Sequence, residues 1–167
     1  MKVAMLVEDH YQVLEVWYPY LRLAEDGIET VLVGTGKKQV YDSKEGYPAE
    51  VSMAIQDVKV GDFDAVVIPG GFAPDILRRY PEVNEFVKHM FDSGKVVAGI
   101  CHGGWVLCSA GILKGKKATA FFAIKDDMVN AGCEFVDAEV VVDGNLITSR
   151  NPFDLSAFCK EIIRKLK

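Results

Sequence analysis

The sequence of 167 residues lacks the features that mark several large classes of protein. It has no apolar run of membrane-spanning length, and the N-terminal run Lys2–Val7 stops at Glu8-Asp9, short of a signal peptide. It also lacks an excess of basic residues, because its net charge is −5. A nucleic-acid-binding surface is expected to carry clustered basic residues. We therefore expect a cytoplasmic protein that binds neither membranes nor nucleic acids.

Cysteine is scarce, and no two cysteines have the spacing of a metal or redox motif. The four are Cys101, Cys108, Cys133 and Cys159. The absence of a C-x-x-C pair excludes a zinc knuckle and a thioredoxin motif. The stretch Gly34–Lys38 looks like part of a phosphate-binding loop but lacks its spacing and its Ser/Thr. We predict no metal and no cofactor, with three of the reduced thiols serving as small core residues.

The sequence does contain short apolar runs that alternate with amphipathic segments. Strands are predicted at 2–7, 29–33, 65–68, 96–100, 117–120, 138–142 and 146–149. Helices are predicted at 12–26, from about 74, at 81–93, 105–110, 124–131 and 154–166. This alternation is typical of a mainly parallel α/β sheet sandwiched by helices on both faces. No linker or repeat divides the chain, so we predict a single domain over residues 1–167.

One short motif points to chemistry. The β-branched run that begins at Val96 ends at Cys101, with Gly99 and Gly103 two residues to either side. This is the G-x-S-x-G turn from strand to helix with cysteine in place of serine, and it predicts a strained backbone that presents a nucleophile. His102 is adjacent and can lower the pKa of the thiol or act as a base. Because the two residues are neighbours, their side chains are expected to diverge, which leaves direct contact open.

The carboxyl ends of the predicted strands bring three segments to one edge of the sheet. These are Glu8–Glu15, Pro69–Asp75 and Cys101–Gly104. Within the second segment, Gly70 and Gly71 can turn backbone N–H groups toward a developing oxyanion. A plain tight turn explains the same glycine pair equally well, so both interpretations stay open.

Two further side chains near this edge have more than one interpretation. Glu15 lies in the first turn of a predicted helix, where the helix dipole favours a carboxylate, and its spacing alone favours an exposed position. Alternatively, a protonated Glu15 within reach of Cys101 would stabilise the thiolate. Trp105 is expected in the core or in the wall of a pocket.

At Gly99-Ile100-Cys101-His102-Gly103 the chain resembles the ThiJ/PfpI superfamily, and most closely its PfpI-type intracellular protease branch. The resemblance extends nearly end to end, over Tyr18-Pro19-Tyr20, Pro69-Gly70-Gly71, Ala73-Pro74, Ser109-Ala110-Gly111, Ile124–Asp127, Asn130-Ala131-Gly132 and Val136–Asn145. It implies a flavodoxin-like fold of the class I glutamine amidotransferase type.

The resemblance also implies roles for individual residues. These are the nucleophile Cys101, its carboxylate contact Glu15, and the oxyanion donors Gly70, Gly71 and His102. In the protease branch an acidic residue from a neighbouring subunit orients the histidine, and the matching position here is Asp75, where that branch commonly has the longer glutamate. The implied partner is a second copy of the chain, in a homodimer or a hexamer.

The chain departs from the protease branch at two positions of the expected pocket. Gln12 stands where that branch tends to have glutamate, and Phe121 where it tends to have tyrosine. Three functions follow. The leading one is a cysteine hydrolase acting on a peptide or a small carbonyl substrate. The second is a glyoxalase or deglycase acting on methylglyoxal or its protein adducts. The third is a redox-sensing or chaperone-like stress protein in which Cys101 is oxidised.

Overall fold

The computed structural model describes residues 1–167 and is built on one seven-stranded sheet. Its strands are β1 (Lys2–Leu6), β2 (Glu29–Gly34), β5 (Met53–Ala54), β6 (Ala65–Ile68), β7 (Val96–Ile100), β10 (Val141–Asp143) and β11 (Leu146–Ser149). They lie in the order β10-β11-β7-β6-β1-β2-β5, and only β10 runs antiparallel to its neighbour. The predicted mainly parallel sheet is confirmed.

The composition of the central strands explains their place in the sheet. Every residue of β6 and β7 is buried, and both are short runs of small and β-branched apolar side chains. Such continuous apolar runs suit parallel strands, which are covered on both faces. The buried apolar residues form one contiguous core.

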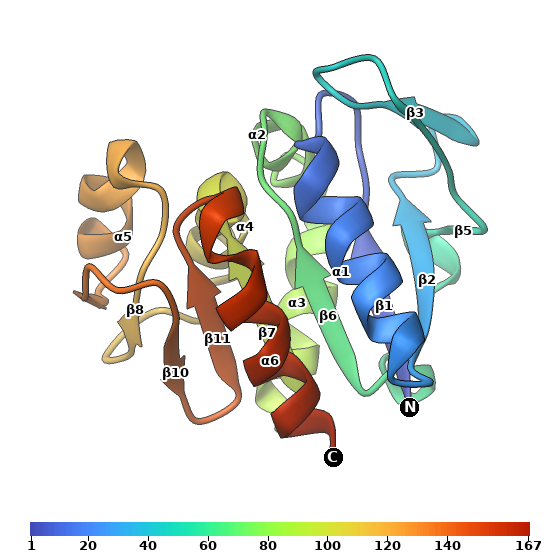
Figure 1. Ribbon diagram of the computed structural model, residues 1–167. Coiled ribbons are helices and arrows are strands. Elements are labelled where there is room, and N and C mark those ends of the chain that lie inside the picture. The colour runs from blue at the N-terminus through green and yellow to red at the C-terminus, as the bar shows by residue number, and fades with distance from the viewer.

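Helices cover both faces of the sheet, as predicted. They are α1 (Val13–Glu25), α2 (Ala73–Leu77), α3 (Pro81–Asp92), α4 (Gly104–Ala110), α5 (Lys125–Asn130) and α6 (Leu155–Leu166). Figure 1 shows α1 and α6 together on one face, with α3 and α4 behind the sheet. None of the helices is both long enough and apolar enough to cross a bilayer.

Small elements flank the sheet, and some differ from their predicted bounds. The strands β3 (Val40–Asp42) and β4 (Pro48–Glu50) form a hairpin. The strand β8 (Lys117–Ala118) pairs with β9 (Glu134–Phe135), and β9 was not predicted from the sequence. The strand expected at 117–120 stops early because the backbone N–H of Thr119 donates to the Thr148 side chain. The strand expected at 138–142 starts only at Val141, because a tight turn precedes it, in which the Ala138 N–H bonds to the Val136 carbonyl.

The strand order creates a switch point beside β1. The chain leaves β1 for β2 on one side and later returns to β6 on the other side. In open α/β sheets the loops at such a point diverge and leave a crevice at the carboxyl ends of the strands. The loops that follow β1, β6 and β7 all end there, next to one another.

Candidate active site

Cys101 lies at the end of β7 on a strained backbone. Its φ is 59°, in the left-handed region that side chains other than glycine rarely adopt, and the residue is 8% exposed. The turn requires Gly103, because a Cβ there would lie 2.5 Å from the carbonyl oxygen of Ile68. The predicted nucleophile turn is therefore present, with the short helical turn Cys101–Gly103 leading into α4.

His102 contacts Cys101 directly. The Nδ1 atom of the imidazole lies 3.4 Å from the Cys101 Sγ, so the expectation that these side chains diverge is wrong. The left-handed residue followed by a tight helical turn brings both side chains to one side of the chain. The imidazole is held between the rings of Trp105 and Phe121, each with its centroid 5.0 Å away.

Glu15 is fully buried beneath the thiol, which corrects the interpretation from spacing alone. Gln12 caps α1 through its side chain and directs the first turn inward, where Glu15 is 0% exposed. Its Oε2 accepts a hydrogen bond of 2.6 Å from the Gly70 N–H, while Oε1 is buried without a partner. A Cβ on Gly70 would lie 2.6 Å from that Oε2 and 2.7 Å from the Cys101 Cβ. Only glycine at this position therefore allows the Glu15 carboxyl group and the Cys101 side chain to lie side by side.

The same hydrogen bond changes the expected oxyanion site. Because the Gly70 N–H is bound to Glu15, it is not free to donate to an oxyanion, and that predicted role is wrong. The N–H groups of Gly71 and His102 point instead toward the Cys101 sulfur, where they lower the pKa of the thiol. These two donors remain for a negative charge that develops at or beside the sulfur.

Burial controls the charges of the site. It raises the pKa of Glu15 to about 7 and, together with the negative charge of Glu15, raises the pKa of Cys101 to about 12. It also lowers the pKa of His102, and the positive charge of Lys44 lowers it further. At neutral pH the site therefore holds a thiol, a neutral imidazole and a carboxyl group that is partly protonated. Thiolate forms only when its proton moves to a neighbour.

A Glu15→Gln variant should remove a pH dependence of the free energy of unfolding. Because the pKa of Glu15 rises on folding from 4.5 to about 7, the free energy of unfolding falls as pH rises through that range. The loss approaches roughly 3 kcal/mol above pH 7. We expect urea denaturation to find the variant more stable than the wild type at pH 8, with little difference at pH 4.5. Glu85→Gln, at an exposed position of α3, is the control, and a variant that keeps the wild-type slope contradicts this account.

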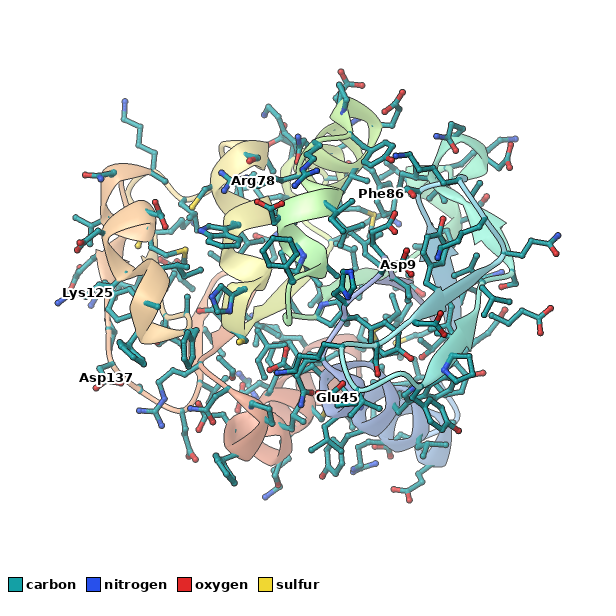
Figure 2. The ribbon with its side chains drawn as sticks, turned by 90° about the horizontal axis from the view of Figure 1, so that it is seen from above. Asp9, Glu45, Arg78, Phe86, Lys125 and Asp137 are labelled. Atoms are coloured by element: carbon teal, nitrogen blue, oxygen red, sulfur yellow. The ribbon has the colours of Figure 1, made fainter.

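These groups open into a cavity of about 300 Å³ at the carboxyl edge of the sheet. Its lining comprises Gln12, Glu15, Lys44, Gly71, Phe72, Cys101, His102, Trp105, Phe121, Asn151 and Pro152. Figure 2 looks down on this edge, where Arg78 lies beside α4 and Glu45 lies by the start of α1. The predicted pocket residues Gln12, Trp105 and Phe121 are thus brought together around the predicted nucleophile.

Several lining residues were not predicted from the sequence. Lys44 follows the β3 strand, and nothing in the local sequence places it near the cavity. Asn151 does have a local signal, because an asparagine before Pro152 is typical of a helix N-cap, and its side chain accepts from the Phe153 N–H. No group of three or more histidine, cysteine or acidic side chains is arranged to hold a metal ion.

Asp75 lies outside the cavity of its own chain. It occupies the first turn of α2, and its carboxylate pairs with Arg79 one turn later on the same helix. The side chain remains about one third exposed. Its expected contact with the histidine of a neighbouring subunit therefore requires that subunit to approach α2.

Sequence comparisons relate the whole chain to known proteins. The model of the DJ-1/PfpI family matches residues 1–165. The chain is 48% identical to "Deglycase PYRAB04690" of Pyrococcus abyssi and 45% identical to "Deglycase PfpI" of Pyrococcus furiosus, in both cases over all of each chain. It is 41% identical to "Putative cysteine protease YraA" of Bacillus subtilis, over 99% of this chain and 98% of that one.

A comparison of structures agrees. The fold superposes with a TM-score of 0.97 on a two-domain protein of Anabaena variabilis that contains DJ-1/ThiJ/PfpI-like and ferritin-like domains, at 43% identity. The match covers 99% of this chain and 48% of that one. With a family model that spans nearly every residue, this chain belongs to the DJ-1/PfpI family.

Proposed function

We propose that this protein is a cysteine-dependent enzyme of the deglycase type, which converts 2-oxoaldehydes and their adducts to 2-hydroxy acids. The observation that carries the proposal is the arrangement of Cys101 between two proton carriers, His102 and Glu15, at the floor of a small cavity. Relatives named deglycases that match over their whole length support it.

The first step is addition of the sulfur to the aldehyde carbon. The Cys101 proton moves to Nδ1 of His102 as the S–C bond forms, and the carbonyl oxygen takes the negative charge beside the free N–H groups. The imidazolium then returns the proton to that oxygen, which gives a hemithioacetal. Because the proton is transferred during attack, the raised pKa of the thiol does not prevent the reaction.

The next steps shift a proton between adjacent carbons. The Glu15 carboxylate removes the proton from the hemithioacetal carbon, while His102 passes the hydroxyl proton of that carbon to the neighbouring ketone oxygen. Glu15 then returns its proton to the former ketone carbon, and the hydroxyl that lost its proton becomes the carbonyl of a thioester. One carbon is oxidised and its neighbour reduced, so no external oxidant is needed. Water then cleaves the thioester and releases a 2-hydroxy acid and the Cys101 thiol. A pKa of about 7 suits Glu15 to both accepting and donating a proton near neutral pH.

The surroundings of His102 and Cys101 favour this reaction over the alternatives. Peptide hydrolysis needs a histidine that is oriented to protonate the leaving amine, and within its own chain the His102 imidazole has no acidic hydrogen-bond partner. Redox sensing requires a thiolate in the resting state, whereas burial raises the pKa of this thiol. An aldehyde expels no leaving group when the sulfur adds, so the addition needs neither condition.

We expect the purified protein to form lactate from methylglyoxal and to release no fluorophore from quenched peptides. Chromatographic detection of lactate and a fluorescence assay on the same preparation measure the two activities. A preparation that cleaves peptides and forms no lactate would establish the peptidase alternative instead.

We also propose that the functional unit is a homodimer or a hexamer in which Asp75 of one subunit orients His102 of another. The exposed part of the Asp75 side chain and its place outside its own cavity support this arrangement. Sedimentation velocity tests it, because a protein that is active as a monomer at assay concentration contradicts a role in trans.

A further inference from the structure

The mouth of the cavity presents hydrogen-bond donors. The Gln12 Oε1 accepts from the Glu15 N–H at 2.9 Å, and the Asn151 Oδ1 accepts from the Phe153 N–H at 3.0 Å. Because a backbone N–H fixes the oxygen of each amide, the NH₂ half of each is left for the cavity that these residues line. Both side chains therefore act as helix caps and keep N–H groups available for a ligand.

Lys44 adds the only cation to the cavity lining. Its backbone N–H donates to the Tyr11 carbonyl at 3.0 Å, which ties it to the segment that leads into α1. Its charge acts on the reacting groups, since it lowers the pKa of both Glu15 and His102. Its ammonium is only loosely paired, at 3.8 Å from the Glu45 carboxylate, and is about half exposed.

The acceptors of the site lie with the reacting groups around Cys101, and the free one, Oε1 of Glu15, is buried. Oε2 of Glu15 is bound to the Gly70 N–H, and Nδ1 of His102 faces the thiol. The cavity thus combines a reacting set around Cys101 with a donor set formed by Gln12, Lys44 and Asn151. A ligand that satisfies both sets has an electrophilic carbon at one end and an acceptor-only, negatively charged group at the other.

We infer that the preferred substrate of the proposed reaction is a 2-oxoaldehyde, free or as an adduct, that carries a carboxylate at its far end. A carboxylate has acceptor oxygens only, and its hydrogen bonds to an ammonium and to amide N–H groups are charge-assisted. The cavity of about 300 Å³ has room for on the order of ten non-hydrogen atoms at the volume that liquid water occupies. A five-carbon chain with its oxygens meets that limit. This inference rests on the proposed function and specifies its substrate.

The test compares two substrates that share the reacting end. One is the unbranched five-carbon 2-oxoaldehyde ending in a carboxylate, and the other is its terminal carboxamide. We expect wild-type kcat/KM to be about tenfold higher for the carboxylate, mainly through KM, and the preference to shrink as salt increases. In Lys44→Met the ratio should fall to about one. Using the ratio cancels any effect of Lys44 on the pKa of Glu15 or His102, because the reacting ends are the same.

The matched control is Lys59→Met, an exposed lysine that precedes the short helical turn Val60–Asp62 and lies outside the cavity lining, which should keep the wild-type ratio. Equal rates on both substrates in the wild type, or an unchanged ratio in Lys44→Met, would overturn the inference while leaving the proposed function intact. If neither substrate is turned over, the proposed function fails. Calorimetric titration of Cys101→Ser with the same two compounds then decides, because equal affinity contradicts carboxylate recognition and tighter binding of the carboxylate supports it.

Discussion

Replacing Cys101 by serine is expected to lower kcat/KM for methylglyoxal at least about 10³-fold. The sulfur is the only strong nucleophile in the cavity lining. His102 can take its proton, and two backbone N–H groups can donate hydrogen bonds to the negative charge that develops. A serine hydroxyl has a far higher pKa than a thiol, and the same burial opposes its ionisation. Lactate formation followed by chromatography at saturating and subsaturating substrate measures the loss.

Cys108→Ser is the matched control for this substitution. Cys108 is half-buried on α4, and its sulfur lies 3.8 Å from the Met128 sulfur, outside the cavity lining. This variant should retain nearly all activity. If Cys101→Ser and the wild type form lactate at the same rate while both remain folded by circular dichroism, Cys101 is not the nucleophile.

Among substitutions that add a single methyl group to the turn around Cys101, Gly103→Ala should lower the free energy of unfolding most. The new Cβ would lie 2.5 Å from the main-chain oxygen of Ile68, which cannot move without disturbing β6. We expect a loss of about 3 kcal/mol in the free energy of unfolding, measured by urea denaturation, because overpacking against backbone forces a shift of the chain. Activity should fall with it, since the same shift moves His102.

Two other glycines make this prediction specific. A Cβ at Gly99 meets only the flexible end of Leu107, at 3.0 Å, so Gly99→Ala should cost less than Gly103→Ala. A Cβ at Gly61 meets nothing within 4 Å, and Gly61→Ala should be neutral or slightly stabilising. Equal losses at all three positions would show that helix and turn propensity matters here and that the contact with Ile68 does not.

The sequence predicts the central strands and the nucleophile turn well, because both depend on local patterns of residues. Continuous β-branched runs locate β6 and β7 with the correct bounds, and the two glycines around Cys101 predict the strained turn. Short strands are predicted less well. The strand expected from 138 starts late because a tight turn competes with extension, and nothing in the spacing of the residues reports it.

The site is predicted only in part because its key contacts join distant segments. The burial of Glu15 depends on Gly70, 55 positions away in the chain, and the same bond removes Gly70 from the oxyanion site. Lys44 reaches the cavity through a hairpin that pairs with the loop after β1, an arrangement that periodicity does not report. Only the family resemblance indicates the correct surroundings of Glu15.

Main-chain hydrogen bonds hold the loops of the active site together. The Gln12 N–H donates to the Gly70 carbonyl, the Phe72 N–H to the His10 carbonyl, and the Phe121 N–H to the Cys101 carbonyl. These bonds do not depend on which side chains the donor residues carry. Substitutions at the cavity wall can therefore change which molecules are accepted while the nucleophile keeps its place. Homologues of this chain can therefore change their substrates through cavity-wall substitutions that cost little stability. A change in the reaction itself would require simultaneous substitution of the glycines around Cys101 and of the buried carboxyl group.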